Sequence, residues 1–392
     1  MIAAIVGEWA ALALRWLHVL AAMSWFGASF FLLALDMRMR RAGAAAGETA
    51  AWIALPGGLL RAEPTSRPPA AGAPLALQRV VYAAWISGFL LLILLYYARA
   101  ELRLVDPRLL ALAPAQGVLL SLASLVLGYG AYELLCRSPL ARDGRLMAAA
   151  GALLAVLAAW AYARLFAGRA AMLHIGILLG TCMAANVGHV IAPAQRAALR
   201  ALEGGPAPDP ERIRRARERV RHNAYLALPV TFTMIAGHAP LSFENRTLPL
   251  VFALALGAGF ALRHFLDRHH LGARRPWWSL LAAAAALALA VLISLPPRAA
   301  ADHGPAPDAS RVREIVADRC LVCHAGRPSW YGLAGPAGGV RLDSPRELRR
   351  HRREIGLQTY LSRAMPPGNV TGMSEEERAL IARWAFRPGG DE

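Results

Sequence analysis

The sequence lacks lysine altogether, so arginine carries every basic charge outside histidine. Lysine and arginine together number 43 against 26 acidic residues, which gives a net charge of +17. Such a charge invites a nucleic-acid partner, but the arginines cluster in short loops between apolar runs. In that arrangement arginines orient helices in a bilayer, so no nucleic-acid partner is expected.

Cysteine is scarce as well, with four in the chain. We expect Cys136 at a cytoplasmic helix end and Cys182 in mid-membrane, so no disulfide joins them. The other two lie in Cys320-Leu321-Val322-Cys323-His324, and no second cysteine pair exists to complete a zinc site. This spacing predicts the attachment site of a c-type haem, with two thioethers and His324 as proximal iron ligand.

A second axial ligand is expected after this motif, and Met365 is the first choice. It lies in Arg363-Ala364-Met365-Pro366-Pro367-Gly368-Asn369, where two prolines stiffen the loop. Met373 is the weaker candidate, and Met365 as an ordinary core methionine is the alternative. Around the ligands, residues 310–392 are predicted to form a small class I-type cytochrome c domain with helices at 310–319, 345–364 and 374–386, the last opened by the Ser374/Glu377 capping box.

The rest of the chain is predicted to be an integral membrane domain, residues 1–297, joined by a linker at 298–309. Apolar residues make up 56% of the sequence. The expected fold class is all-α, an eight-span transmembrane bundle. Its first apolar run is too long for a cleavable signal peptide. The eight stretches near spanning length are 9–35, 80–97, 116–135, 146–163, 173–192, 224–241, 248–266 and 277–295.

Arginine placement predicts the orientation. The loops 36–79, 136–145, 193–223 and 263–276 carry 21 arginines, against 6 in the alternate loops. By the positive-inside rule the first set is cytoplasmic, which places both termini and the haem motif in the periplasm of a bacterial inner membrane. Because haem c is attached outside the cytoplasm, the motif requires the same orientation. A charged helix at 209–222 is expected as a solvated cytoplasmic cap.

Polar side chains at membrane depth are candidate site residues. Arg15, His18 and Asp36 share one helical face of the first stretch, where an arginine costs about 3 kcal/mol unless it faces protein, a wet cavity or the interface. Asn186 adds a polar group to the fifth stretch, which small residues at every fourth position (Gly176 to Gly188) place centrally. Histidines are predicted at two depths, which makes them candidates for substrate or haem b, with a structural role as the alternative: His18, His174 and His238 in the periplasmic half, His189, His222 and His264 in the cytoplasmic half.

Four segments of the sequence carry a resemblance. They are Arg15 to Asp36, Gly180 to Arg196, His222 to His238, and Arg319 to His324 with Met365 to Asn369. Together they resemble the membrane-bound urate oxidases, or urate hydroxylases, in which an eight-span domain is fused to a C-terminal cytochrome c. The segment 54–82 departs from the family pattern, which has a lysine and a Trp-Glu pair there, and this puts the substrate in question.

The resemblance implies that urate, or a related purine, is oxidised to 5-hydroxyisourate without hydrogen peroxide, with electrons leaving through haem c to a respiratory cytochrome or terminal oxidase. Arg15 would hold the planar anion, and His18 or His238 would accept a proton. His174 and His238 are candidate ligands of a second redox centre such as haem b. The alternative function is that of a respiratory electron-transfer subunit that takes electrons from quinol. A third possible function is that of a membrane transporter with an attached redox sensor. The catalytic candidates are Arg15, His18, Asp36, His174, Asn186, His222 and His238.

Overall fold

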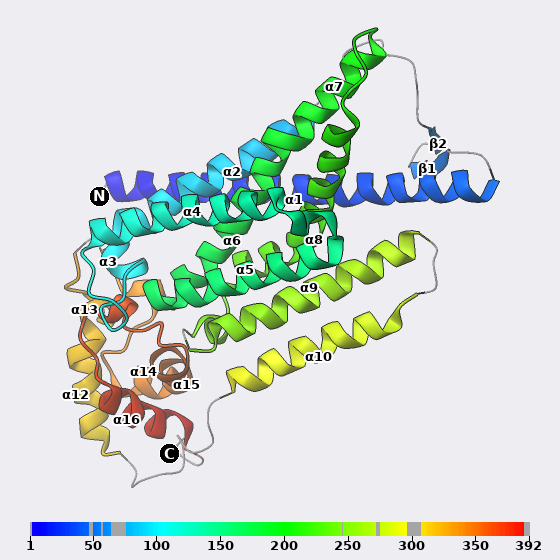
Figure 1. The fold of residues 1–392 in the computed structure, drawn as a ribbon. Coiled ribbons are helices and arrows are strands. Elements are labelled where there is room, and N and C mark those ends of the chain that lie inside the picture. The colour runs from blue at the N-terminus through cyan, green and yellow to red at the C-terminus, as the bar shows by residue number, and fades with distance from the viewer. Residues whose placement is uncertain are drawn as a thin grey trace.

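The computed structural model describes residues 2–46, 50–55, 58–63, 76–244, 246–271, 275–295, 307–331 and 333–387. Long helices form a bundle, and a unit of short helices lies at one end of it (Figure 1). The bundle comprises α1 (Ile2–Ala46), β1 (Ala51–Leu55), β2 (Gly58–Ala62), α2 (Ala76–Leu95), η1 (Tyr97–Arg99), α3 (Ala100–Arg103), α4 (Pro114–Arg137), η2 (Pro139–Arg142), α5 (Gly144–Leu165), α6 (Gly168–Ala185), η3 (Asn186–Ile191), α7 (Ala192–Leu202), α8 (Pro210–Ala236), η4 (Pro240–Phe243), α9 (Leu248–His270) and α10 (Trp277–Ser294).

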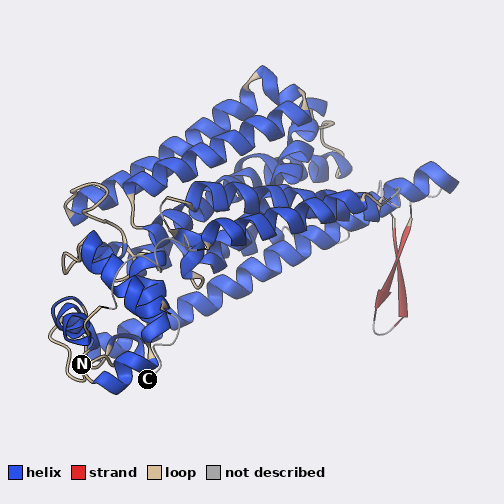
Figure 2. Ribbon diagram, turned by 90° about the horizontal axis from the view of Figure 1, so that it is seen from below, coloured by secondary structure: helices blue, strands red, loops and turns tan. Residues whose placement is uncertain are grey.

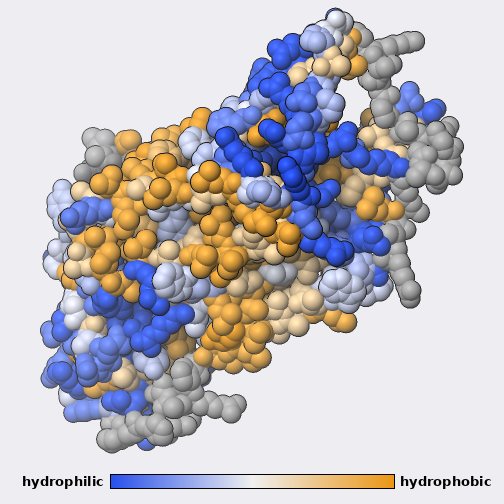
Figure 3. Space-filling model, viewed as in Figure 1, coloured by the Kyte–Doolittle hydropathy of each residue, from blue (hydrophilic) through white to orange (hydrophobic). Residues whose placement is uncertain are grey.

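Within the described ranges, seven helical stretches are long and apolar enough to cross a membrane. They correspond to the predicted spans except the sixth, and they make the chain a multi-pass membrane protein. Figure 3 shows a band of apolar surface across the bundle, with hydrophilic surface at both ends. The stretches are 6–40, 77–103, 114–137, 144–165, 168–202, 248–270 and 277–294.

The predicted sixth span lies on α8, which is not among the seven. Its helix ends at Ala236, so the apolar part 224–236 reaches only about 20 Å, whereas a bilayer core is about 30 Å thick. The charged segment 209–222 is not a separate helix, because it continues into α8, but its arginines other than Arg219 are exposed as expected. Arg219 in this segment is buried, with 6% of its surface exposed.

α6 is the most enclosed of the seven stretches, as its small residues predict. Gly176 faces Thr233 of α8 so closely that a Cβ would lie 2.2 Å from the hydroxyl oxygen. A Cβ on Gly188 of η3 would likewise lie 2.6 Å from the Tyr82 hydroxyl of α2. The small residues therefore let α2 and α8 pack against the central helix.

The segment after the first span is not entirely loop. β1 and β2 pair as an antiparallel hairpin in which Trp52 opposes Arg61 and Leu55 opposes Gly58. The hairpin follows α1, which continues well past the predicted end of the first span at residue 35. The expected all-α architecture is therefore correct for the bundle, with one small hairpin added; much of the loop, and the linker up to residue 306, lie outside the described residues.

The C-terminal unit has an apolar core of its own, built around Val312, Ile315, Leu348 and Ile381. The predicted helix 345–364 is instead broken at His351 and ends in a π turn. The helix from 375 is confirmed, including the capping box. The elements are α12 (Ala309–Arg319), α13 (Leu321–His324), η5 (Ala337–Gly339), α14 (Pro345–Arg350), α15 (Arg352–Gly356), η6 (Leu357–Leu361), η7 (Pro367–Asn369) and α16 (Glu375–Phe386).

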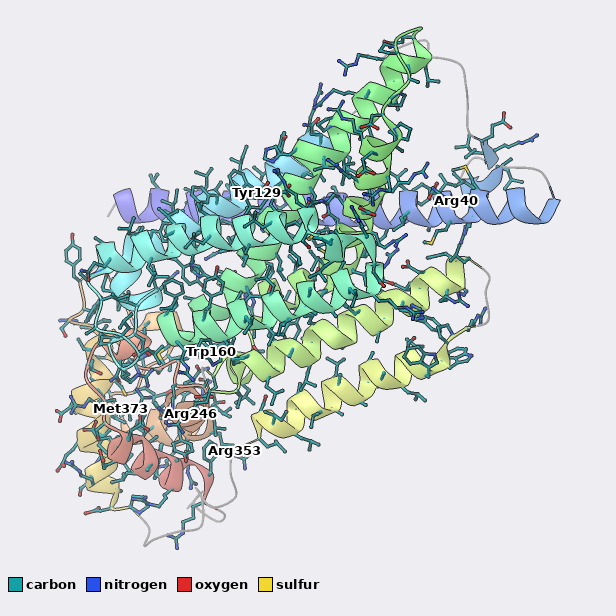
Figure 4. All side chains as sticks on the ribbon, in the orientation of Figure 1. Arg40, Tyr129, Trp160, Arg246, Arg353 and Met373 are labelled. Atoms are coloured by element: carbon teal, nitrogen blue, oxygen red, sulfur yellow. The ribbon has the colours of Figure 1, made fainter. Side chains whose placement is uncertain are left out.

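The C-terminal unit rests on the bundle at one end. η7 contacts α3, and η6 contacts η4. Arg246, Arg353 and Met373 lie at this end of the molecule, while Arg40 lies at the other (Figure 4). The start of α1 and the C-terminal unit lie at the same end of the bundle (Figures 1 and 2).

Candidate functional site

Polar side chains from three elements meet inside the bundle, and we refer to them as the inner polar cluster. Asn186 is 2% exposed and Asn223 is 8% exposed, so these groups need partners within the protein. Asn186 opens the π turn η3, where the wider backbone turn re-aims its side chain, a feature common at functional sites. The members are Tyr132 and Glu133 of α4, Asn186 of η3, and Arg219, His222 and Asn223 of α8.

Asn186 is the centre of the inner polar cluster. Its amide nitrogen donates to the Tyr132 hydroxyl and to Oδ1 of Asn223, both at 2.8 Å. Its Oδ1 accepts a hydrogen bond of 3.0 Å from Arg219. Asn223 in turn donates to the Met183 carbonyl at 3.0 Å. Every polar atom of the Asn186 side chain therefore has a partner, which fixes the amide's orientation.

Arg219 brings a charge into this buried region. It donates to Oε2 of Glu133 at 2.8 Å, and its guanidinium carbon lies 5.1 Å from the centre of the Tyr132 ring. Glu133 also accepts from Arg137, which is exposed. The ion pair and the aromatic ring compensate the cost of removing Arg219 from water, so the charge is held at a fixed place.

His222 joins the cluster to an open space. Its Nδ1 lies 2.9 Å from the Tyr132 hydroxyl, which leaves Nε2 as the ring nitrogen that can bind another molecule. His222, Tyr132 and Cys182 line a cavity of about 760 Å³ between α4, α5, α6, α8 and α9. The size is within the usual range for small-molecule sites.

The cavity has two kinds of wall. Its deep part is apolar, with Leu154, Leu178, Leu179, Leu256 and Phe260. Its other end is lined by exposed or half-buried charged residues at the η2 turn and on α8. Asp143 there caps α5 by accepting from the Arg145 and Leu146 amides, which fixes the turn. The charged residues of this end are Arg142, Asp143, Arg145, Glu218 and Arg221.

Two of the predicted site residues, Asn186 and His222, are brought together, because both bond the Tyr132 hydroxyl. The prediction missed Tyr132, Glu133 and Arg219. Glu133 carried a usable signal, since an acidic residue inside an apolar stretch is a functional candidate by default. Tyr132 carried none, because an aromatic residue in such a stretch is ordinary.

His174 lies in a different, closed arrangement, which we call the closed polar chain: Tyr97, Ser121 and His174. Tyr97 is 2.7 Å from the Ser121 hydroxyl, which is 2.7 Å from Nε2 of His174. The other ring nitrogen is 2.7 Å from the Ala170 carbonyl. His174 has no exposed surface, and both of its nitrogens are occupied, so an iron ligand role would require Ser121 to give way.

The other predicted residues lie apart from the cavity. Arg15 is exposed on α1, and Asp36 forms an ion pair with Arg40. Nδ1 of His18 is 2.8 Å from the Ala84 carbonyl of α2. His238 is exposed and bonds the Ile235 carbonyl of its own helix. Their proposed roles stay predictions.

The C-terminal motif has the donors that a covalently attached haem needs. Cys320 and Cys323 are both free, one turn apart, and burial raises the pKa of Cys320 to about 12. Nδ1 of His324 is 3.0 Å from the Val340 carbonyl, and this bond leaves Nε2 to bind iron. The arrangement therefore fits the group.

The two candidate methionine ligands differ in their surroundings. Met373 is 3% exposed and packs in the core of the C-terminal unit, whereas Met365 is half-buried. Arg378, which has no exposed surface, donates to the Met365 carbonyl at 2.8 Å and to Oδ1 of Asn369 at 2.9 Å. Burial lowers the pKa of Arg378 to about 10. These bonds fix the backbone of the methionine loop, and the choice of Met365 as the iron ligand stays a prediction.

Comparison with known proteins gives one match. Residues 4–294 match the model of a family described as "Urate oxidase N-terminal". No curated protein and no solved structure matches the chain. The matched range contains the bundle from residue 4 onward, including the inner polar cluster and every residue of the cavity wall.

Proposed function

The chain belongs to the urate oxidase N-terminal family, and from this premise we propose that it oxidises urate at the cavity beside the inner polar cluster. The family match suggests a membrane protein that acts on urate. The cavity is proposed as the site because it extends from the fixed side chains of Tyr132 and His222 to an opening lined with arginine. The proposed product is 5-hydroxyisourate.

Binding of urate follows from charge and shape. Urate is a planar anion at neutral pH, and the Arg142, Arg145 and Arg221 side chains at the open end of the cavity attract it. The apolar deep part accommodates the faces of the purine. The oriented Tyr132 hydroxyl and His222 ring are the polar groups that fix the position of the purine edge.

The reaction converts urate and water into 5-hydroxyisourate, two protons and two electrons. His222 is proposed to accept a proton at Nε2, because Nδ1 is held by Tyr132. Arg219, paired with Glu133, holds a fixed positive charge against the Tyr132 ring, and together with Asn186 it keeps the Tyr132 hydroxyl directed at His222. The second proton leaves through water at the open end.

The electrons are proposed to leave through a haem c on the C-terminal unit, which would be a class I-type cytochrome c domain. Cys320 and Cys323 would attach the group, and His324 and Met365 would ligate the iron. The bound haem supplies a one-electron acceptor, so the two electrons leave singly. A respiratory cytochrome or terminal oxidase would then take each electron.

The same assignment gives the orientation. We propose that α8 crosses the membrane together with the seven apolar stretches, with its charged half in the cytoplasmic boundary. The arginine-rich loops are then cytoplasmic. Both termini and the C-terminal unit lie in the periplasm of a bacterial inner membrane.

A second candidate is favoured by the apolar wall of the cavity. Leu178, Leu256 and Phe260 suit the ring and tail of a quinol as well as a purine face. In that case the chain is a respiratory electron-transfer subunit with no purine substrate.

An anaerobic experiment separates the two. Urate is added to the oxidised, purified protein and the reduced haem c absorption band is followed, with Met365→Ala beside it. We expect urate to reduce the wild-type haem, and Met365→Ala to change the haem spectrum and potential. Reduction by a quinol and not by urate would contradict urate as the substrate and support the electron-transfer subunit.

A further inference from the structure

The C-terminal unit meets the bundle at a contact that only glycine allows. Gly368, in the loop that follows Met365, has φ +55°. A Cβ at this position would lie 2.6 Å from the Glu101 carbonyl oxygen and 3.0 Å from that of Val105. The methionine loop therefore approaches the backbone of the α3 region more closely than any side chain would permit.

This contact continues into the bundle. Leu104, between the two carbonyls, has no exposed surface, and its own carbonyl accepts a 2.9 Å hydrogen bond from the Ala167 amide. The preceding residue, Phe166, is fully buried and stacks on the His174 ring at 4.7 Å between centroids. The loop is thus joined to a packed aromatic group through one segment of backbone and one hydrogen bond.

The aromatic group reaches the cavity. Tyr162 lies 5.6 Å from His174 and 5.9 Å from Phe166, measured between ring centroids. Ala158 of α5 and Leu178 of α6 line the cavity. Tyr162 lies four residues after Ala158, and His174 lies four residues before Leu178. Four residues span about 6 Å along a helix axis. The three rings therefore stand one helical turn beyond the cavity wall, on the side of the C-terminal unit.

We propose that these contacts form the electron route from the cavity to the methionine loop, with the Gly368 contact as the docking point. The electron source rests on the proposed function. A bound haem would accept one electron at a time, so urate would give up its two electrons in two single transfers, with an external one-electron acceptor such as a soluble cytochrome taking each electron from the C-terminal unit. The buried rings of Tyr162, Phe166 and His174 exclude water along the route.

Gly368→Ala tests the docking point, and the chain offers a matched control. Gly372 also has a positive φ, +66°, but a Cβ there would meet no atom within 4 Å. Gly372→Ala therefore adds the same backbone strain without touching the bundle. Both variants are compared with the wild type as full-length protein in detergent.

Two readouts are needed. Amide hydrogen exchange of residues 100–106 reports docking without any substrate, and we expect it to become faster in Gly368→Ala alone. Urate-driven reduction of the haem should slow by about a hundredfold in Gly368→Ala, the scale on which an ångström of misplacement acts. Dithionite should still reduce the haem fully. Equal exchange and equal rates in the two glycine variants would overturn the proposal.

A second pair of variants tests whether the aromatic rings belong to the route. Phe166→Leu removes a ring from the route, whereas Phe252→Leu removes one that is equally buried on α9. We expect slower urate-driven reduction in Phe166→Leu alone; equal rates would remove the rings from the route. If urate fails to reduce the wild-type haem, the proposed function fails, while the exchange experiment still decides whether Gly368 docks the unit.

Discussion

Two groups of buried polar side chains lie in the same bundle and differ in what surrounds them. The closed polar chain of Tyr97, Ser121 and His174 is neutral, and both His174 ring nitrogens have partners within 2.7 Å. The inner polar cluster contains an ion pair, and its histidine, His222, borders a cavity of about 760 Å³.

The comparison teaches that residue type and depth do not separate a histidine bonded entirely within the protein from one that can bind another molecule. Both histidines lie within or beside apolar stretches of similar composition. What differs is whether the second ring nitrogen is already bonded and whether a space adjoins it. His174 is held on both sides, whereas His222 keeps Nε2 for a bound molecule.

The largest effect is expected at His222. His222→Gln removes the proposed proton acceptor while keeping a polar side chain, and a positioned acid–base group contributes about 10²–10⁴-fold to a rate. We expect the steady-state rate of urate oxidation to fall by that range, measured by the loss of urate absorbance. The fall should shrink when a small imidazole is added to the medium.

The matched control comes from the closed polar chain. Ser121→Ala removes one partner from Tyr97 and His174 and is expected to cost about 1 kcal/mol of stability. A rate in His222→Gln close to that of the wild type would break the comparison, because the free Nε2 of His222 would then have no part in the reaction.

Arg219 should have the next largest effect, on stability. Arg219→Met leaves Asn186 without its buried donor and Glu133 with only the exposed Arg137 as partner, which we expect to cost about 3 kcal/mol, since breaking a buried ion pair leaves a poorly compensated charge. Arg215→Met is the control on the same helix. Arg215 pairs with Glu211 in an exposed position, where such pairs contribute at most about 1 kcal/mol. Thermal unfolding in detergent measures both, and equal losses would contradict a structural role of the cluster.

The smallest effect is expected at an ion pair outside the bilayer. Glu377 pairs with Arg319 at 3.0 Å, and its side chain is 14% exposed. Burial alone would raise its pKa, but hydrogen bonds from Arg319 and from the Ser374 amide lower it below the usual range. Because the pKa of Glu377 is lower in the folded than in the unfolded protein, its negative charge stabilises the unit fully above about pH 4.3, the usual pKa of glutamate. This stabilisation is lost as the pH falls through the folded pKa.

Glu377→Gln keeps the capping box and removes only the charge. The variant should be less stable than the wild type by under about 1 kcal/mol near neutrality, because such partly exposed pairs contribute little. The difference should vanish toward pH 3, as followed by circular dichroism. A difference that does not change with pH would show that the charge of Glu377 has no part in it.

The sequence was a good guide to elements that depend on local patterns. The apolar stretches, the central position of α6 and the Ser374/Glu377 cap all follow from composition or spacing. The prediction was wrong where charged residues interrupt a pattern of helical residues. Arginines at 212–221 predicted a separate cap, but α8 continues through them because Arg219 finds Glu133 of α4 in the folded chain.

The inner polar cluster could be predicted only in part. Asn186 and His222 were named because polar groups at membrane depth are rare. Their meeting point, Tyr132, is 54 residues from Asn186 and 90 from His222, and no local pattern encodes that contact. The cavity is likewise a property of five packed helices, so one sequence without its fold gives no sign of it.

The charged end of the cavity and the C-terminal unit lie at opposite ends of the bundle, since η2 closes one end while α3 and η4 carry the unit at the other. A charge that moves between them crosses part of the membrane potential, which acts with about 2.3 kcal/mol per elementary charge and 100 mV over the full thickness. Under the proposed orientation, electrons that take this path move toward the outer face and are driven by an interior-negative voltage. Turnover in a sealed vesicle would therefore generate an electrical current, and its rate would depend on the voltage.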